Sequence, residues 1–281
     1  MKRIIEDVKR LSGSILTLLL LAEPGIAYAT PTLMNGSFEL TSNGPNKLLP
    51  DTLPTGWAYS GGVAALYAAG AADQIGTNVG PIYLWGPANP LPNALNGLPS
   101  TSPEGGNYIA SDSDPTFSGA FTQTINDLMP GGEYLLTFYY AAAQFRNPSG
   151  TFWNGASHSL WQVSLGSAGS YDTLDLSIDN HGFSGWRFES HIFSVPNTSN
   201  GSEVLRFLAI GGPGGLPPVA LLDGISLTAV PEPESLLLVG IALLGLLAAR
   251  RRQGKAPLIA LILTNAEQPT SQINHVRVST L

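Results

Sequence analysis

Apolar and polar residues alternate in short runs through the central part of the chain, and turn residues separate the runs. Side chains alternate over residues 121–125, and a Pro130-Gly131-Gly132 turn follows. The chain returns through residues 134–140, which are rich in strand-forming aromatics. Alternation with a period of two is typical of strands that bury one face. Similar runs predict further strands at 161–165, 186–195, 204–210 and 219–228.

The N-terminal end follows a different pattern. An apolar stretch at residues 15–22 comes after four basic residues, and Ala27-Tyr28-Ala29 is a small-x-small site. A basic region, an apolar stretch and small residues in this order are typical of a secretory signal peptide. The sequence therefore predicts a signal helix at residues 1–29 and a mature chain that begins at Thr30. An amphipathic or buried helix is the alternative.

A second apolar run lies near the C-terminal end. Residues 236–249 carry no charged or polar side chain, and three arginines, Arg250–Arg252, follow at once. A helix of this length is about 21 Å long, whereas the hydrocarbon core of a bilayer is ~30 Å thick. Flanking residues and snorkelling arginines could make up the difference. We therefore predict a transmembrane helix that contacts the membrane through residues 236–249, with a buried core helix as the alternative.

Composition supports an all-β domain between these ends. The chain has 32 glycines and 22 prolines, and only 12% of its residues are charged, which favours short strands joined by turns. It has no cysteine, so disulfides, thiolate nucleophiles and Cys-ligated zinc are excluded. Residues 30–230 contain 14 acids and 4 bases. Because phosphate binding relies on Lys and Arg, we expect no nucleic-acid partner.

Residues 43–113 show no regular alternation. They are rich in Pro, Gly, Asn and Ala, with scattered aromatic residues. We expect long irregular loops here that are either functional or mobile. The evenly spaced short strands elsewhere predict an antiparallel β-sandwich or jelly roll.

The C-terminal segment resembles a known sorting signal. Pro231-Glu232-Pro233, the apolar run and the arginines agree in order and spacing with the PEP-CTERM family. The resemblance implies an exosortase, a membrane protease, as partner, and a Gram-negative host that makes exopolysaccharide. It also implies an inner-membrane intermediate and a final place at the cell surface or in the extracellular matrix. The residues that would form the signal are Val230, Pro231, Glu232, Pro233, Arg250, Arg251 and Arg252.

The central domain resembles a second family. The motifs Asn35-Gly36-Ser37-Phe38-Glu39, Gly56-Trp57 and Leu221-Leu222-Asp223-Gly224-Ile225 occur in an order similar to galactose-binding-like jelly rolls, which include carbohydrate-binding modules. The chain then divides into four parts. These are a signal peptide (1–29), a β-sandwich domain (30–229), a sorting and anchor segment (230–252) and a tail (253–281), which departs from the PEP-CTERM pattern and which we expect to be disordered.

Glu39 and Asp223 are the acids of greatest interest. Asp223 shares strand parity with Leu221, Ile225 and Leu227, and a carboxylate on an apolar face needs a hydrogen bond, a partner or a cation. In the jelly rolls that the domain resembles, acids of the first and last strands often bind a structural Ca²⁺. The resemblance therefore implies a calcium site at Glu39 and Asp223, with capping of backbone amides as the alternative.

Other acids and the aromatic residues are weaker candidates. We interpret Asp112, Asp114, Asp175 and Asp179 as solvated loop acids, since they lack the spacing of an EF-hand loop. Trp57, Trp161 and Trp186 are expected in the core. The aromatic residues in Gly-, Pro- and Asn-rich loops are candidates for stacking on sugar rings, with plain loop packing as the alternative; these are Tyr83, Trp85, Phe152 and Trp153.

Signatures of enzymes are few. The sequence contains neither an HExxH zinc motif nor a G-x-S-x-G nucleophile elbow, and we assign no catalytic residue. The leading expectation is an exported non-catalytic protein of the cell surface or exopolysaccharide matrix that binds glycan. A secreted hydrolase acting on polysaccharide and a purely structural matrix protein are the alternatives.

Overall fold

The computed structural model describes residues 30–74, 82–88, 96–146, 154–216, 218–231 and 233–253. Residues 27–231 form one compact unit, and the helix α2 (Pro233–Gln253) belongs to another. The predicted signal peptide and tail residues 254–281 lie outside the described residues.

The domain is built from short antiparallel strands. Their bounds are β1 (Lys47–Leu48), β2 (Ala58–Tyr59), β3 (Ala64–Tyr67), β4 (Tyr83–Leu84), β5 (Tyr108–Asp112), β6 (Ala120–Ile125), β7 (Glu133–Arg146), β8 (Ser157–Leu165), β9 (Ser170–Asp172), β10 (Leu176–Ile178), β11 (Arg187–Ser194), β12 (Glu203–Gly212) and β13 (Pro218–Ala229). All the strands predicted from alternation are present, as β6, β7, β8, β11, β12 and β13.

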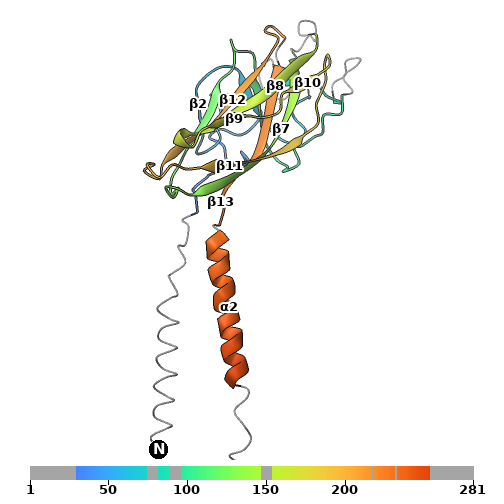
Figure 1. Ribbon diagram of the computed structural model, residues 1–281. Helices are drawn as coiled ribbons and strands as arrows, with labels where there is room; N and C mark the ends of the chain where they lie inside the picture. The colour runs from blue at the N-terminus through green and yellow to red at the C-terminus, as the bar shows by residue number, and fades with distance from the viewer. Residues whose placement is uncertain are drawn as a thin grey trace, which may run out of the picture. The chain divides into compact units, whose positions relative to one another are not determined.

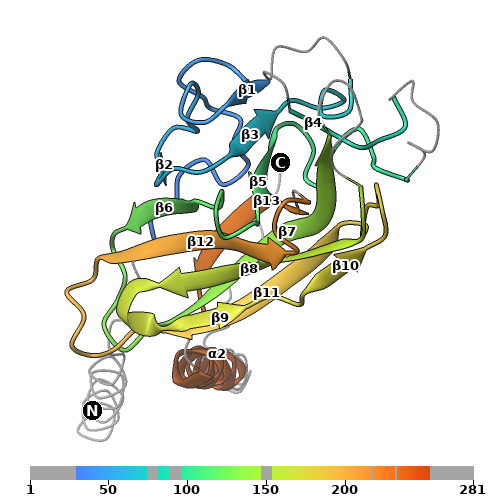
Figure 2. The same cartoon turned by 90° about the horizontal axis from the view of Figure 1, so that it is seen from above.

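The strands form two sheets that lie face to face (Figures 1 and 2). A seven-stranded sheet has the order β1-β3-β5-β13-β7-β11, with β4 paired to β7. A six-stranded sheet has the order β10-β8-β12-β6-β2, with β9 paired to β8. The predicted antiparallel β-sandwich of the jelly-roll type is confirmed.

The main core fills the space between the two sheets. Its largest members are aromatic, and they contact one another edge-on or tilted, as Phe138 and Trp161 do with Phe207. Trp161 is fully buried, and its indole N–H donates a hydrogen bond of 3.0 Å to the carbonyl of Leu221 across the core. Trp57 is buried here as well, so the prediction for these two tryptophans is confirmed.

A second hydrophobic cluster covers part of the opposite, outer face of the seven-stranded sheet. Residues from the supposedly irregular segment 43–113 form most of it, together with Ala141, Ala143 and Phe145 of β7 and Val219 of β13. The expectation of long structureless loops was therefore wrong in part. Strands β3 and β5 are buried on both faces, and a strand without a solvent-facing side shows no alternation. Trp186 packs against this cluster and is only partly buried.

A bulge interrupts β13 at its middle. The register with β7 shifts between Asp223 and Ser226, and Gly224 has φ +62°. Before the bulge Leu221 faces the second cluster, whereas Ile225 after it faces the main core. The predicted shared parity of Asp223 with Ile225 was wrong, because one extra residue turns the rest of the strand over.

The apolar run near the C-terminus is helical, as predicted, within α2. Among the described residues, however, no helix is both long and apolar enough to cross a membrane. The predicted transmembrane helix, with its membrane contact through residues 236–249, is therefore not supported. The uncharged run would reach only about 21 Å as a helix, which is shorter than the ~30 Å core it would have to cross.

Candidate functional site

The opening motif of the domain lies against the bulge of β13. The amide of Ile225 donates a 3.0 Å hydrogen bond to the carbonyl of Gly36. A Cβ atom on Gly36 would lie 1.9 Å from the carbonyl oxygen of Ile225, so only glycine permits this approach. The contact brings Glu39, three residues further on, close enough to the middle of β13 to influence Asp223 electrostatically.

Asp223 is a fully buried carboxyl group. One oxygen accepts a 2.7 Å hydrogen bond from the amide of Gly224, and the other accepts a short hydrogen bond from the hydroxyl of Ser102. Burial raises the pKa of Asp223 to about 7 against the effect of these two bonds, and repulsion from Glu104 and Glu39 adds to the rise. At neutral pH this side chain exchanges between its acid and carboxylate forms.

Glu39 is held by the loop that leads into β5. Its Oε1 accepts a 2.6 Å hydrogen bond from the amide of Asn107, whose side-chain amide donates to the carbonyl of Phe38 at 3.1 Å. Gly106 has φ +64°, and a Cβ there would lie 1.8 Å from Oε1 of Glu39. The loop is therefore shaped around this carboxylate.

The structure thus brings the two predicted acids into one neighbourhood and adds Glu104, which sequence reasoning missed. The Cβ of Glu104 lies 3.3 Å from where a side chain on Gly224 would begin. Within the described ranges, no three His, Asp or Glu side chains are grouped so that they could hold a metal ion. Calcium binding at Glu39 and Asp223 stays a prediction.

Two of the predicted sugar-stacking residues are buried. Tyr83 is 6% exposed and Trp85 is 2% exposed, so neither offers a free ring face, and the alternative of loop packing is the one observed. Trp85 stacks on His181, with ring centroids 3.5 Å apart and planes at 14°. Phe152 and Trp153 lie outside the described residues.

An aromatic pair that sequence reasoning missed, with one exposed and one half-buried ring, lies next to the acids. Phe188 of β11 is 59% exposed, and it lies opposite Tyr139 of β7 with ring centroids 5.4 Å apart. Tyr139 also reaches within 3.1 Å of where a side chain on Gly224 would begin. The sequence contained the information needed to predict an outward-facing Phe188. Phe188 and the buried Phe193 are five residues apart, and a strand places residues at this spacing on opposite faces.

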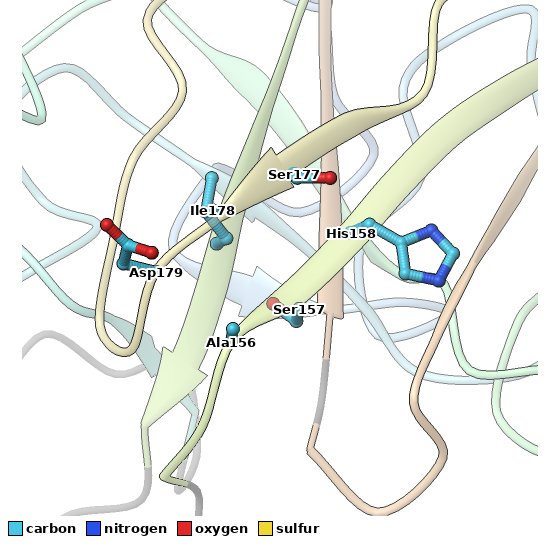
Figure 3. A pocket seen from close by; sticks show the side chains of 6 residues that line it. All are labelled: Ala156, Ser157, His158, Ser177, Ile178 and Asp179. Carbon is cyan, nitrogen blue, oxygen red and sulfur yellow. The ribbon is translucent and has the colours of Figure 1, made fainter.

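A shallow pocket lies where β8 begins beside β10 (Figure 3). Its volume is about 320 Å³, and its lining includes His158, Ser177 and Asp179. His158 pairs with Asp175 at 2.9 Å, but both side chains are nearly half exposed. The pair therefore contributes little to the stability of the fold. His158 and Asp179 point away from each other in Figure 3, so these two lining residues do not form an acid–base pair in the pocket.

Two acids predicted to be solvated are buried instead. Asp112 accepts a 2.9 Å hydrogen bond from the amide of Asp114, and Asp114 accepts from the amides of Thr116 and Gly215. Burial raises the pKa of Asp112 to about 7. The amide donors lower the pKa of Asp114. The bonds from Asp114 and Thr116 fold the turn after β5, and the bond from Gly215 ties this turn to the segment between β12 and β13. Both roles are structural.

Residues 229–252 match the family profile described as the PEP-CTERM protein-sorting motif. The chain carries this motif, as predicted, and the motif implies export, processing by an exosortase and sorting toward the cell surface. Arg250 is exposed near the end of α2, whereas Glu232 lies outside the described residues. A search of the curated proteins found no match.

Solved structures that resemble the chain include an apo cyclase from Fischerella sp., at 14% identity and a TM-score of 0.43, covering 72% of this chain and 97% of that one. TmCBM61 in complex with beta-1,4-galactotriose aligns at 15% identity and a TM-score of 0.34, covering 72% of this chain and all (100%) of the other. The arabinose-bound α-L-arabinofuranosidase MgGH51 aligns at 16% identity and a TM-score of 0.36, covering 74% and 27%. Likeness at this level does not identify a ligand or an activity.

Proposed function

We propose that this chain is an exported, non-catalytic protein of a Gram-negative cell surface or exopolysaccharide matrix, and that its domain binds glycan. The sorting motif at 229–252 supports the proposed export toward the cell surface. The glycan-binding part rests on one observation, the exposed ring of Phe188 beside the half-buried ring of Tyr139 on the outer face of the seven-stranded sheet. We call the part of this face that the second hydrophobic cluster does not cover, on strands β13, β7 and β11, the open face.

The chemistry of the open face suits a neutral sugar chain. Aromatic rings combine a large apolar surface with a defined orientation, and the C–H faces of sugar rings pack well on them. The side chains of β13 that share this face beyond the bulge are the exposed Ser226 and Thr228, which can donate and accept hydrogen bonds. Glu104 at the border adds a carboxylate that accepts hydrogen bonds from sugar hydroxyls.

The proposal is tested by retention of the full-length chain on a panel of immobilised polysaccharides. Phe188→Ala should abolish retention, and Tyr139→Ala should weaken it. Phe117→Ala is the matched control, because Phe117 is also an exposed aromatic side chain, at 47%, and it lies outside the open face. Retention that survives Phe188→Ala would refute the assignment of the face. Absence of retention on every polysaccharide would favour a purely structural matrix protein.

One observation favours a hydrolase as the second candidate. An acid with a pKa near 7 beside further carboxylates is the arrangement that glycoside hydrolysis uses. Asp223 is fully buried, however, and both of its oxygens accept hydrogen bonds from the protein, so we place it in the scaffold. Release of reducing sugar from exopolysaccharide by the wild-type chain, lost in Asp223→Asn, would establish the hydrolase instead.

A further inference from the structure

The last residue of β7, Arg146, is a cation in an unusual position. Residues 30–230 contain 4 basic side chains, and Arg146 alone among them is fully buried. All three of its guanidinium nitrogens are without a hydrogen-bond partner within the described part of the chain. A buried, unpaired guanidinium is costly, and such groups normally pair with an anion.

Strand pairing explains what surrounds this side chain. Tyr83 lies directly opposite Arg146 in the β4–β7 ladder, and the amide of Trp85 donates to the carbonyl of Gln144 at 3.1 Å. The guanidinium carbon is 5.5 Å from the centre of the Tyr83 ring and 5.8 Å from that of Trp85. Two aromatic rings thus flank the cation and partly stabilise it.

A second unpaired donor belongs to one of these two flanking rings. The indole N–H of Trp85 is buried and has no partner among the described residues. Arg and Trp side chains offer only donors, so neither can satisfy the other. What the pair lacks is an acceptor.

The protein does not supply that acceptor from its nearest acid. Asp73 is close enough to influence Arg146 electrostatically, but no ion pair within 4 Å joins them in the described structure. The Oδ2 of Asp73 instead accepts a 2.8 Å hydrogen bond from the amide of Ala88. A Cβ on Gly86 would lie 2.4 Å from this oxygen, so the turn holds the carboxylate in place.

The neighbouring polar groups are already engaged, which fixes the two donors. Gln144 is fully buried and accepts from the amide of His181 at 2.9 Å. His181 stacks on Trp85, and Asn96 donates to the carbonyls of both residues at 2.8 Å. The rings and their backbone are therefore held rigidly, while the guanidinium and the indole N–H stay unpaired. Donors that are held in place before binding are typical of a recognition site.

From this arrangement we propose that Arg146 and the indole N–H of Trp85 form a binding site for a carboxylate group. A guanidinium offers parallel N–H donors that match the two oxygens of a carboxylate. The net charge also favours a monoanion over sulfate or phosphate dianions, because Asp73 is nearby and acids exceed bases by 14 to 4 in residues 30–230. The carboxylate comes from a free small acid or from a uronic acid. This site does not involve the open face.

The test uses the full-length chain with sodium acetate and sodium glucuronate as probes, against sodium chloride and sodium sulfate at equal ionic strength. Both carboxylates should raise the melting temperature by several degrees in a saturable way and change the tryptophan fluorescence. A response to acetate alone assigns the site to small free acids, whereas a response to both includes uronic acids. A general salt effect, equal in chloride or sulfate, would overturn the proposal.

Substitutions separate binding from a purely structural role. In chloride alone, Arg146→Met should melt at or above the wild-type temperature, because an unpaired buried charge is removed, and it should no longer respond to carboxylates. Arg146→Lys keeps the positive charge but loses the parallel N–H donors of the guanidinium. The affinity of this variant for carboxylates should fall roughly tenfold. Arg206→Met, on β12 of the other sheet, is the matched control and should respond as the wild type does. A destabilised or unfolded Arg146→Met chain would mean that Arg146 holds the fold together, which contradicts the proposal. Phe188→Ala should leave the carboxylate response intact.

Discussion

Asp223→Asn should change the pH dependence of stability in a direction that is opposite to that expected of an ordinary paired acid. The carboxyl group has a pKa of about 7 in the folded chain, raised by burial from 3.8. The native state therefore keeps a proton between about pH 4 and pH 7 that the unfolded state has already released. The free energy of unfolding falls as the pH rises through this window. The stabilisation that the proton on Asp223 gives to the native state is fully present only below about pH 4.

The size of the effect follows from the shift in proton affinity. A change from 3.8 to about 7 is roughly a thousandfold, which corresponds to about 4 kcal/mol. Asparagine resembles the protonated acid and does not titrate. It can accept from the amide of Gly224, and the hydroxyl of Ser102 can rotate to accept from it. The variant should match the wild type at pH 4 and exceed it by up to about 4 kcal/mol at pH 8.

Urea unfolding of the full-length chain at several pH values between 4 and 8, in the presence of a chelator, measures this difference. Asp112 titrates in the same range, but its contribution is common to both proteins and cancels. Asp114→Asn is the control of opposite sign, because amide donors lower the pKa of Asp114 and its charged form stabilises the native state at neutral pH. Parallel stability curves for Asp223→Asn and the wild type would refute the reasoning, as would a less stable variant at pH 8.

Three further predictions follow from the same region and from the sorting segment. If Glu39 and Asp223 bind calcium, a chelator should lower the melting temperature of the wild type by several degrees and added Ca²⁺ should restore it, with no effect of either on Asp223→Asn. Gly36→Ala should cost about 3 kcal/mol or more in urea unfolding, since its Cβ would lie 1.9 Å from a backbone oxygen; a loss below 1 kcal/mol would show that the bulge can move away. Mass spectrometry of the surface-exposed protein should find no peptides from residues 254–281 if an exosortase cuts at the motif, and their presence there would show that the segment is not processed.

Alternation along the chain was a reliable guide wherever a strand buries one face. Strand β8 shows it clearly, with every second residue buried from Ser157 to Leu165. The same reasoning could not find β3 or β5, because the second cluster covers the face that would otherwise be polar. The information that was missing is tertiary: whether a sheet is covered on its outer side depends on a segment far away in the sequence.

The candidate site shows the same division between local and tertiary information. The motifs around Glu39 and Asp223 pointed to two acids that the structure brings into one neighbourhood, because a carboxylate in an apolar strand needs a hydrogen bond, a partner or a cation. They did not show which face Asp223 takes, since the bulge at Gly224 reverses the pattern. Loop composition was a poor guide to exposure. Trp85 lies in a Gly- and Pro-rich segment, yet it is 2% exposed because it stacks on a histidine that is distant in the sequence.

Strand β7 shows why the acids and the aromatic pair meet where they do. Its outward side chains Ala141, Ala143 and Phe145 belong to the second cluster, and the small alanines let the covering segment approach closely. Towards the other end the outward side chains Leu135, Thr137 and Tyr139 remain half-buried and uncovered. The bulge of β13 pairs with β7 at this boundary. Asp223 at this boundary is itself fully buried, but it lies opposite Tyr139, whose other strand neighbour is Phe188. Its ionisation therefore responds to how much water lies over the adjoining open face. Binding of a neutral glycan beside Phe188 should therefore raise the pKa of Asp223 further, and a shift of the wild-type stability curve to higher pH in the presence of the bound glycan, absent in Phe188→Ala, would show that the two are coupled.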